Sequence, residues 1–192
     1  MIDFSNNANI EKLIKACIRG EKKYQKILYQ SFYGKMLAVC MRYAADINEA
    51  QDILHDGYIK VFNKLKSFEY KGSFEGWIRR IIVNNAIDYV RNKRDFVISI
   101  SDDNTFNNLK DNSFDNNDEQ LIKMKAEIII KLIQKLSPAY RTVFNMYVIE
   151  EYSHKEIAEE LNISIGTSKS NFAKAKLKLK LLFEQYNIEK RD

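Results

Sequence analysis

The chain has 192 residues, and its single proline and six glycines leave few helix breakers in stretches rich in Lys, Glu, Leu, Ile and Ala. Strand-like alternation is hard to find, so the composition favours an all-α fold and argues against folds built on sheets. The formal net charge of +5 is too common among ordinary proteins to single out a partner.

The distribution of charge says more than its sum. Residues 1–95 carry 17 Lys and Arg against 11 Asp and Glu, residues 96–125 carry 3 against 6, and residues 126–192 carry 11 against 9. Within the acidic segment, residues 101–120 are mostly Asn, Asp and Ser, with too few apolar groups to offset the entropy of ordering. We therefore expect two small helical domains, 1–95 and 126–192, joined by a flexible acidic linker at 96–125.

The cysteines and the N-terminal residues bear on the cellular compartment. Cys17 and Cys40 lie in apolar-periodic segments without a CxxC partner, which favours small buried hydrophobes over a disulfide or a metal site. No basic stretch followed by an apolar one opens the chain, and no apolar run approaches the length of a membrane span. We expect a soluble, cytoplasmic protein without direct membrane insertion.

Breaks in the helical pattern divide the N-terminal half. They lie at residues 20–21, at residues 46–48 and at residues 68–73, around Gly72. These breaks predict about four helices between Ile10 and Arg94.

The C-terminal half contains the signals of a helix-turn-helix. Ser137 and Pro138 form an N-cap and first-turn pair, and Ser153 with Glu156 forms a capping box that predicts a short helix from His154. The tight turn at residues 162–164 then ends in Ser164, a good cap for a further helix from Ile165.

That last helix combines an apolar stripe with a wide cationic surface. Phe172, Ala175 and Leu179 begin a stripe of three-four spacing that must face a core, while lysines and short polar groups occupy the other positions. Polar residues at the start of a basic helix suit binding in the major groove, although a solvated lysine face on a packing helix is the alternative. The candidate DNA-binding residues are Ser164, Thr167, Ser168, Lys169, Ser170, Asn171, Lys174 and Lys178.

The segment EAQDILHDGYIKVFNKL has two faces at helical spacing. Leu54, Gly57, Tyr58, Val61 and Leu65 form the stripe that we expect to face the core. An acidic face on a basic domain suggests a protein partner, while an ordinary solvated face is an equally good interpretation of the periodicity. The candidate partner-binding residues are Asp52, His55, Asp56, Ile59 and Asn63; no fourth ligand accompanies Asp52, His55 and Asp56, so we expect no metal site and no cofactor.

The segment GSFEGWIRRIIVNNAIDYVRNKR predicts one long helix after a cap at Ser73. Its surface mixes basic and amide side chains, which suits contacts with phosphates and with exposed bases. The preceding loop places aromatic residues beside Lys71, where they can stack unpaired bases, although core packing is the commoner fate of a Phe. The candidate residues for single-stranded DNA are Phe68, Tyr70, Lys71, Ser73, Arg80, Asn84, Asn85, Asp88 and Arg91.

Four segments together resemble the sigma-70 family of RNA polymerase initiation factors, and specifically its small extracytoplasmic-function (ECF) group. They are AQDILHDGYIKVF, the GSFEGW segment above, LSPAYRTVF and YSHKEIAEELNISIGTSKSNFAKAKLKLK, in this order with a polar linker between the second and third. The resemblance implies that the first domain melts and recognises the −10 promoter element and that the second recognises the −35 element. It also implies that the face from Asp52 to Asn63 docks on the clamp helices of the polymerase's largest subunit.

The resemblance further implies RNA polymerase core, promoter DNA and an anti-sigma factor as partners, and no enzymatic activity. His55 stands where the family often has Gln. At the DNA-facing positions, lysine and asparagine replace the arginines common in relatives, so bidentate recognition of guanine is not expected there. Target promoters therefore cannot be carried over from the family.

The sequence leaves two alternative functions to consider. A stand-alone helix-turn-helix regulator would bind duplex DNA without polymerase, but it leaves the N-terminal segments unexplained. A metal-dependent helical enzyme has little support in a chain with two His, two Cys and no clustered ligands.

Overall fold

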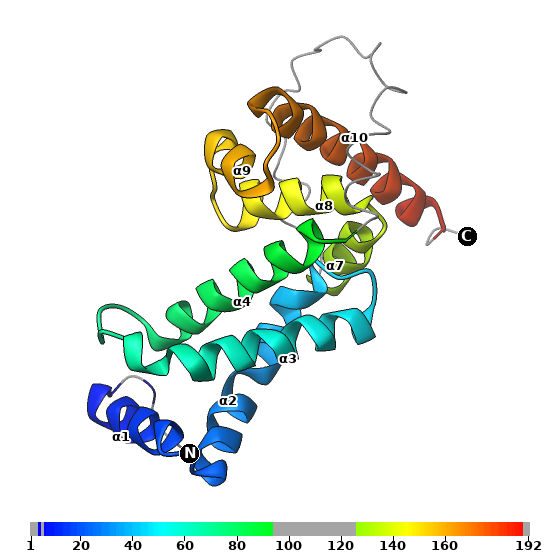
Figure 1. The fold of residues 1–192 in the computed structure, drawn as a ribbon. Coiled ribbons are helices and arrows are strands. Elements are labelled where there is room, and N and C mark those ends of the chain that lie inside the picture. The colour runs from blue at the N-terminus through cyan, green and yellow to red at the C-terminus, as the bar shows by residue number, and fades with distance from the viewer. Residues whose placement is uncertain (1–3, 5, 94–125, 190–192) are drawn as a thin grey trace. The chain divides into compact units, whose positions relative to one another are not determined.

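The computed structural model describes residue 4, residues 6–93 and residues 126–189, and within these residues every regular element is a helix, as Figure 1 shows. The expected all-α fold is confirmed. The predicted linker at 96–125 lies outside the described residues. Among the described helices, none is both long and apolar enough to cross a membrane.

The chain divides into two compact units, Met1–Tyr89 and Val90–Asp192. The N-terminal unit is formed by α1 (Asn7–Ile18), α2 (Lys22–Met41), α3 (Ile47–Lys64), the short 3-10 helix η1 (Leu65–Ser67) and α4 (Phe74–Arg91) up to Tyr89. The helix boundaries agree with the predicted breaks because each break carries a local stop or start signal. Asp46, for example, accepts a hydrogen bond from the Glu49 amide and so caps α3.

The core of the N-terminal unit is made of one stripe from each helix. On α3 the predicted stripe is confirmed, since Leu54, Gly57, Tyr58 and Val61 are all buried, followed by Leu65. Cys17 and Cys40 are buried free thiols, as expected. Burial raises the pKa of Cys17 to about 11 and that of Cys40 to about 12, so both are neutral packing groups near pH 7.

Gly57 faces side chains of α4, which lies beside α3 in Figure 1. A Cβ at Gly57 would lie 2.5 Å from Ile82 Cδ1 and 3.5 Å from Asn85 Nδ2. Only glycine therefore fits at this crossing without a shift of α4 side chains.

We predict that Gly57→Ala fails to deliver the stabilisation of about 1 kcal/mol that alanine ordinarily gives in a helix interior, because overpacking against Ile82 costs about 1–3 kcal/mol. Ile82→Val removes the clashing Cδ1, so Gly57→Ala should be less harmful, or stabilising, in the Ile82→Val background. A double-mutant cycle of urea unfolding checks this coupling. Additive effects of the two substitutions would show that the close approach is absent.

The C-terminal unit contains the predicted helix-turn-helix. Its helices are α7 (Ala126–Gln134), α8 (Pro138–Phe144) with the π-helical turn η3 (Asn145–Ile149), α9 (His154–Leu161) and α10 (Ile165–Glu189). Ser137 caps α8 by accepting from the Tyr140 amide, and Ser153 with Glu156 forms a complete capping box on α9. These caps confirm the predicted helix starts; the π-helical turn carried no sequence signal.

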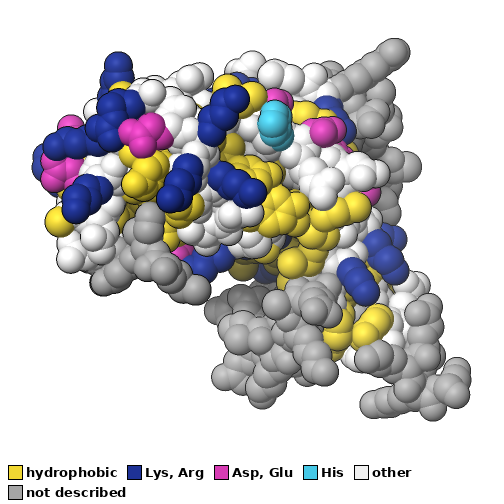
Figure 2. All heavy atoms as spheres, turned by 90° about the horizontal axis from the view of Figure 1, so that it is seen from below, with side chains coloured by type: hydrophobic (Ala, Val, Ile, Leu, Met, Phe, Trp, Pro, Cys, Tyr) yellow, Lys and Arg dark blue, Asp and Glu magenta, His cyan; other side chains and the backbone are white. Residues whose placement is uncertain are grey.

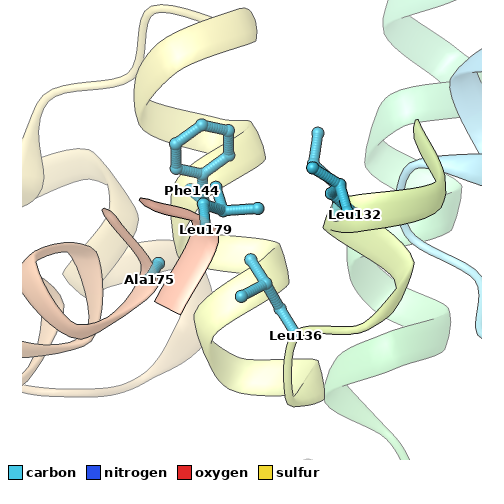
Figure 3. Close-up of a cluster of buried hydrophobic side chains, with 6 residues drawn as sticks. Leu132, Leu136, Phe144, Ala175 and Leu179 are labelled. Carbon is cyan, nitrogen blue, oxygen red and sulfur yellow. The ribbon is translucent and has the colours of Figure 1, made fainter. Parts of the chain in front are cut away.

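The core of this unit joins α7, α8 and α10. Figure 3 shows Leu132 and Leu136 from the α7 side, Phe144 from α8, and Ala175 and Leu179 from α10, and all five are buried in one hydrophobic cluster. The predicted stripe on α10 therefore faces the core. Because α10 is held along this stripe, the side of the helix opposite the stripe faces solvent.

Candidate nucleic-acid and protein interfaces

The turn between α9 and α10 sets the start of α10. Asn162 ends α9 in the left-handed conformation with φ of 54°, which asparagine tolerates better than most residues. Two residues later, the Ser164 hydroxyl lies 2.9 Å from the Thr167 hydroxyl and accepts from the Thr167 amide at 2.9 Å. Ser164 and Thr167 are therefore part of the cap that begins the helix.

The candidate residues on α10 divide by helical phase. Lys169 and Lys178 are exposed, whereas Thr167, Ser170 and Lys174 are half-buried. At 100° per residue, Lys169 lies on one flank of the buried stripe, and Thr167, Ser170, Lys174 and Lys178 lie on the other. Lysines of α10 thus lie on both flanks of its buried stripe. Figure 2 shows one face of the molecule, on which Lys and Arg side chains lie next to exposed hydrophobic ones.

Ser168 and Asn171 contradict the sequence-based expectation. Both are 0% exposed, so neither can contact DNA from the folded unit. The reason is helical phase: Ser168, Asn171, Ala175 and Leu179 fall on the same stripe, which faces α8 and the core. Extending the apolar stripe toward the N-terminus of α10 would have revealed this.

An aromatic cluster surrounds His154 at the start of α9, and no local sequence pattern predicts it. The imidazole stacks on Tyr147 with ring centroids 4.4 Å apart and meets Phe172 of α10 edge-on at 5.7 Å. Its Nδ1 lies 2.9 Å from the Ser168 hydroxyl. His154 therefore joins η3, α9 and α10 at the end of α10 that carries the polar residues. Burial, and to a lesser extent the charge of Lys169, lowers the pKa of His154.

A lowered pKa in the folded chain means that His154 takes up a proton more readily when unfolded. The free energy of unfolding of the C-terminal unit should therefore fall as the pH drops below about 6.5, the ordinary pKa of His. His154→Phe keeps an aromatic ring but does not titrate, so the variant should lose this part of the pH dependence.

Urea unfolding at about pH 7.5 and about pH 5.5, on either side of the ordinary pKa, measures the effect. Hydrogen exchange of the α9 amides follows the C-terminal unit separately. The same loss of stability in both proteins would show that His154 is not the titrating group.

The predicted partner-binding face lies on the solvent side of α3. The candidates are all exposed: Asp52, His55, Asp56, Ile59 and Asn63. Ile59 is 49% exposed and lies near the middle of the 18-residue α3. As expected, α3 has one buried face and one exposed face, and the candidate residues lie on the exposed face. Within the described residues, no cluster of three or more His, Cys, Asp or Glu could hold a metal ion.

The loop before α4 is built on an aromatic cluster. Phe68 is 6% exposed and packs against Tyr70, Phe74 and Trp77, with centroids 5.0, 5.0 and 5.4 Å away. Phe68 is therefore a core residue, and its expected contact with DNA bases is wrong. Tyr70, by contrast, is 36% exposed and has a φ of 60°, a strained conformation for an aromatic residue.

The remaining candidates on the loop and α4 differ in exposure. Lys71, Ser73, Arg80 and Asn84 are exposed, and Lys71 pairs with Glu69 at 2.8 Å. Asp88 is half-buried, with a carboxylate oxygen 3.4 Å from Lys60 Nζ. Arg91 is the last residue of α4.

Asn85 contradicts the expectation for this surface. It is 5% exposed, and its Nδ2 donates to the Ile53 carbonyl at 2.8 Å. Asn85 follows Ile78 by seven residues and Ile82 by three, so all three lie on the buried stripe of α4. The Asn85 side chain therefore faces α3 instead of DNA.

Comparison with known proteins gives these two units a family. Residues 28–96 match the model of sigma-70 region 2, and residues 126–179 match that of sigma-70 region 4, so together the matches span more than half of the chain. The chain belongs to the ECF group of the sigma-70 family of RNA polymerase sigma factors. The region 2 match includes α3 and α4, and the region 4 match includes the helix-turn-helix.

The relatives match over most of their length. The "ECF RNA polymerase sigma factor SigW" of Bacillus subtilis is 28% identical over 167 residues, covering 84% of this chain and 89% of the relative. The "RNA polymerase sigma-H factor" of Pseudomonas aeruginosa is 25% identical, covering 86% and 89%. A solved structure of "the sigma factor RpoE in complex with the anti-sigma factor NepR from Bartonella quintana" is 19% identical with a TM-score of 0.44, covering 83% of this chain and 96% of that one.

Proposed function

We infer that this sigma factor brings RNA polymerase core to specific promoters and helps to open the DNA strands there. The observation that carries this inference is that regions 2 and 4 of the family match the two helical units in order, each with a buried stripe and an exposed polar face. The chain contributes binding and no covalent chemistry of its own. This role places it in the cytoplasm, where core polymerase works.

We propose that α10 lies in the major groove at the −35 element. Lys169 and the pair Lys174 and Lys178 occupy opposite flanks of the helix, which suits the two phosphate backbones that border the groove. Ser164, Thr167 and Ser170 lie near the N-terminal end of α10, where a recognition helix reaches base edges. Ser168 and Asn171 are buried, so the proposed contacts with DNA do not include them.

We propose that the loop before α4 and the exposed face of α4 bind the opened −10 strand. Tyr70 is an exposed aromatic ring beside Lys71, a combination that stacks bases and neutralises phosphates. Arg80 and Asn84 are exposed one helical turn apart on α4 and can contact backbone and bases, together with Ser73, Asp88 and Arg91. Capture of unstacked bases at this surface would favour strand opening.

We propose that the exposed face of α3 binds polymerase core at the clamp helices of the largest subunit. Asp52 and Asp56 supply negative charge and Ile59 supplies apolar area, a combination that steers and then anchors a basic partner. Family membership also leads us to propose an anti-sigma factor as a further partner.

The test of this function is transcription by purified core polymerase with and without the chain. The wild-type chain should direct initiation at discrete start sites, and Asp52→Lys/Asp56→Lys should weaken core binding by at least about tenfold without loss of helicity, because like charges then face the basic partner. Glu11→Lys/Glu69→Lys is a matched control, since it makes the same change of charge at exposed positions of the same unit.

Tight promoter binding by the chain alone, with no association with core, would instead identify a stand-alone regulator. Equal core affinity for the α3 and control variants would exclude α3 as the docking face.

The salt dependence of promoter binding by the holoenzyme tests the α10 surface. Lys169→Ala and Lys178→Ala should each weaken binding and reduce the slope of log K against log salt by up to about one unit, since each removes one phosphate contact. Lys131→Ala and Lys135→Ala, at exposed positions in and just after α7, are the matched controls. An unchanged slope in the α10 variants would place the phosphate contacts elsewhere.

A further inference from the structure

Asn85 makes a buried polar contact between two helices of the N-terminal unit. Its side chain is 5% exposed, and Nδ2 donates a 2.8 Å hydrogen bond across to the Ile53 carbonyl of α3. Ile53 lies well inside α3, where a main-chain carbonyl already accepts a bond from the amide four residues later, that of Gly57. The Asn85 bond is thus additional to the regular bonding of the helix.

The side chains around the Asn85 bond leave little free space. Gly57, four residues after Ile53, has no side chain, and a Cβ there would lie 3.5 Å from Asn85 Nδ2 and 2.5 Å from Ile82 Cδ1. Farther along the same pair of helices, Lys60 and Asp88 approach to 3.4 Å. The crossing of α3 and α4 therefore includes a buried directional bond, that of Asn85, inside an apolar contact.

A directional bond and an apolar contact differ in what they specify. Apolar stripes stabilise two helices over a range of sliding positions, whereas a buried donor is satisfied at one position only. A single buried Asn fixes the register of helices in coiled coils by the same physics.

We propose that Asn85 is a positioning residue that fixes the register of α4 on α3. The proposal rests on the function proposed above, in which the exposed face of α3 docks on polymerase and the exposed face of α4 holds the opened strand. Asp52 and Asp56 flank Ile53 on the outer side of α3, and Asn84 is the neighbour of Asn85 on the outer side of α4. The Asn85 bond thus transmits the position of core polymerase to the residues that meet DNA.

Asn85→Leu tests this role because leucine branches at the same atom as asparagine but has no donor. Ile53 keeps its bond within α3, so no buried carbonyl is left unsatisfied and the thermal midpoint should stay close to that of the wild type. Core affinity should also stay within about twofold, while the rate of promoter opening by the holoenzyme, on a promoter selected with wild-type holoenzyme, should fall about tenfold or more from misplacement of α4. Ile14→Val, a small core deletion on α1, is the control for lost stability.

Asn85→Asp adds a readout that a merely structural role would not move. A carboxylate at this position repels the Ile53 carbonyl, but a protonated carboxyl can donate to it, so burial and the carbonyl should raise the pKa of the new side chain. In this variant the bond to the Ile53 carbonyl stabilises the fold at a pH below the ordinary pKa of Asp. This stabilisation is lost as the pH rises through the raised pKa of the new side chain. Promoter opening by this variant, relative to wild type, should therefore recover as the pH is lowered from about 8 to about 6.

The outcomes separate this proposal from the function on which it rests. Wild-type opening rates in Asn85→Leu, or losses of core affinity and opening that run in parallel as in a destabilised variant, would overturn the positioning role. Failure of the wild-type chain to bind core would overturn the proposed function. The pH dependence of unfolding of Asn85→Asp would still show whether the Ile53 bond exists, and its absence would overturn the positioning role as well.

Discussion

The structure depends on a constraint of size: in a unit of about 90 residues, each helix can bury one stripe and must leave the rest of its surface in water. On α3 the buried stripe runs through Leu54, Tyr58 and Val61, and the opposite side carries Asp56 and Ile59. On α10 the buried stripe runs through Ala175 and Leu179, and lysines line its flanks. Functional surfaces in this sigma factor are the outer faces of helices whose inner faces make the core.

This arrangement makes the orientation of each helix important, and buried polar groups contribute to it. Asn85 bonds α4 to α3, and His154 contacts Ser168 between α9 and α10. Both contacts join a helix with a proposed partner-binding face to its neighbour. Apolar packing supplies most of the stability, while the role proposed for Asn85 is to select one alignment among those that packing would allow.

Local signals made much of the fold predictable. The caps at Ser137, Ser153 and Ser164 act over three residues, and the stripe on α3 repeats at helical spacing, so both can be recognised along the chain. The outward face of α3 follows from the same periodicity. The predicted linker lies outside the described residues, so its order remains a prediction.

The predictions of DNA-binding residues fail where a residue has a suitable chemical type but lies on the buried side of its helix. The amide and hydroxyl groups of Asn85, Ser168 and Asn171 suit contacts with bases, yet these residues lie on the buried stripes of their helices. Phe68 is buried because its ring packs against Phe74 and Trp77, whereas Tyr70, two residues later, is exposed.

The contacts of His154 could not be foreseen, since Tyr147 and Phe172 reach it only through the tertiary fold. Periodicity assigns a residue to a face of its own helix, but it does not say which side chains of other elements will meet it there.

Side-chain footprinting tests most directly the central claim that opposite helix faces serve core and partners. Carboxyl labelling of Asp52 and Asp56 and amine labelling of Lys169 and Lys178 would be measured in the free chain, with core polymerase, and with core and promoter DNA. The account predicts that core protects the two aspartates before DNA is added, and that promoter DNA is needed to protect the two lysines. Aspartates that stay labelled in the holoenzyme, or lysines that stay labelled on the promoter, would contradict it.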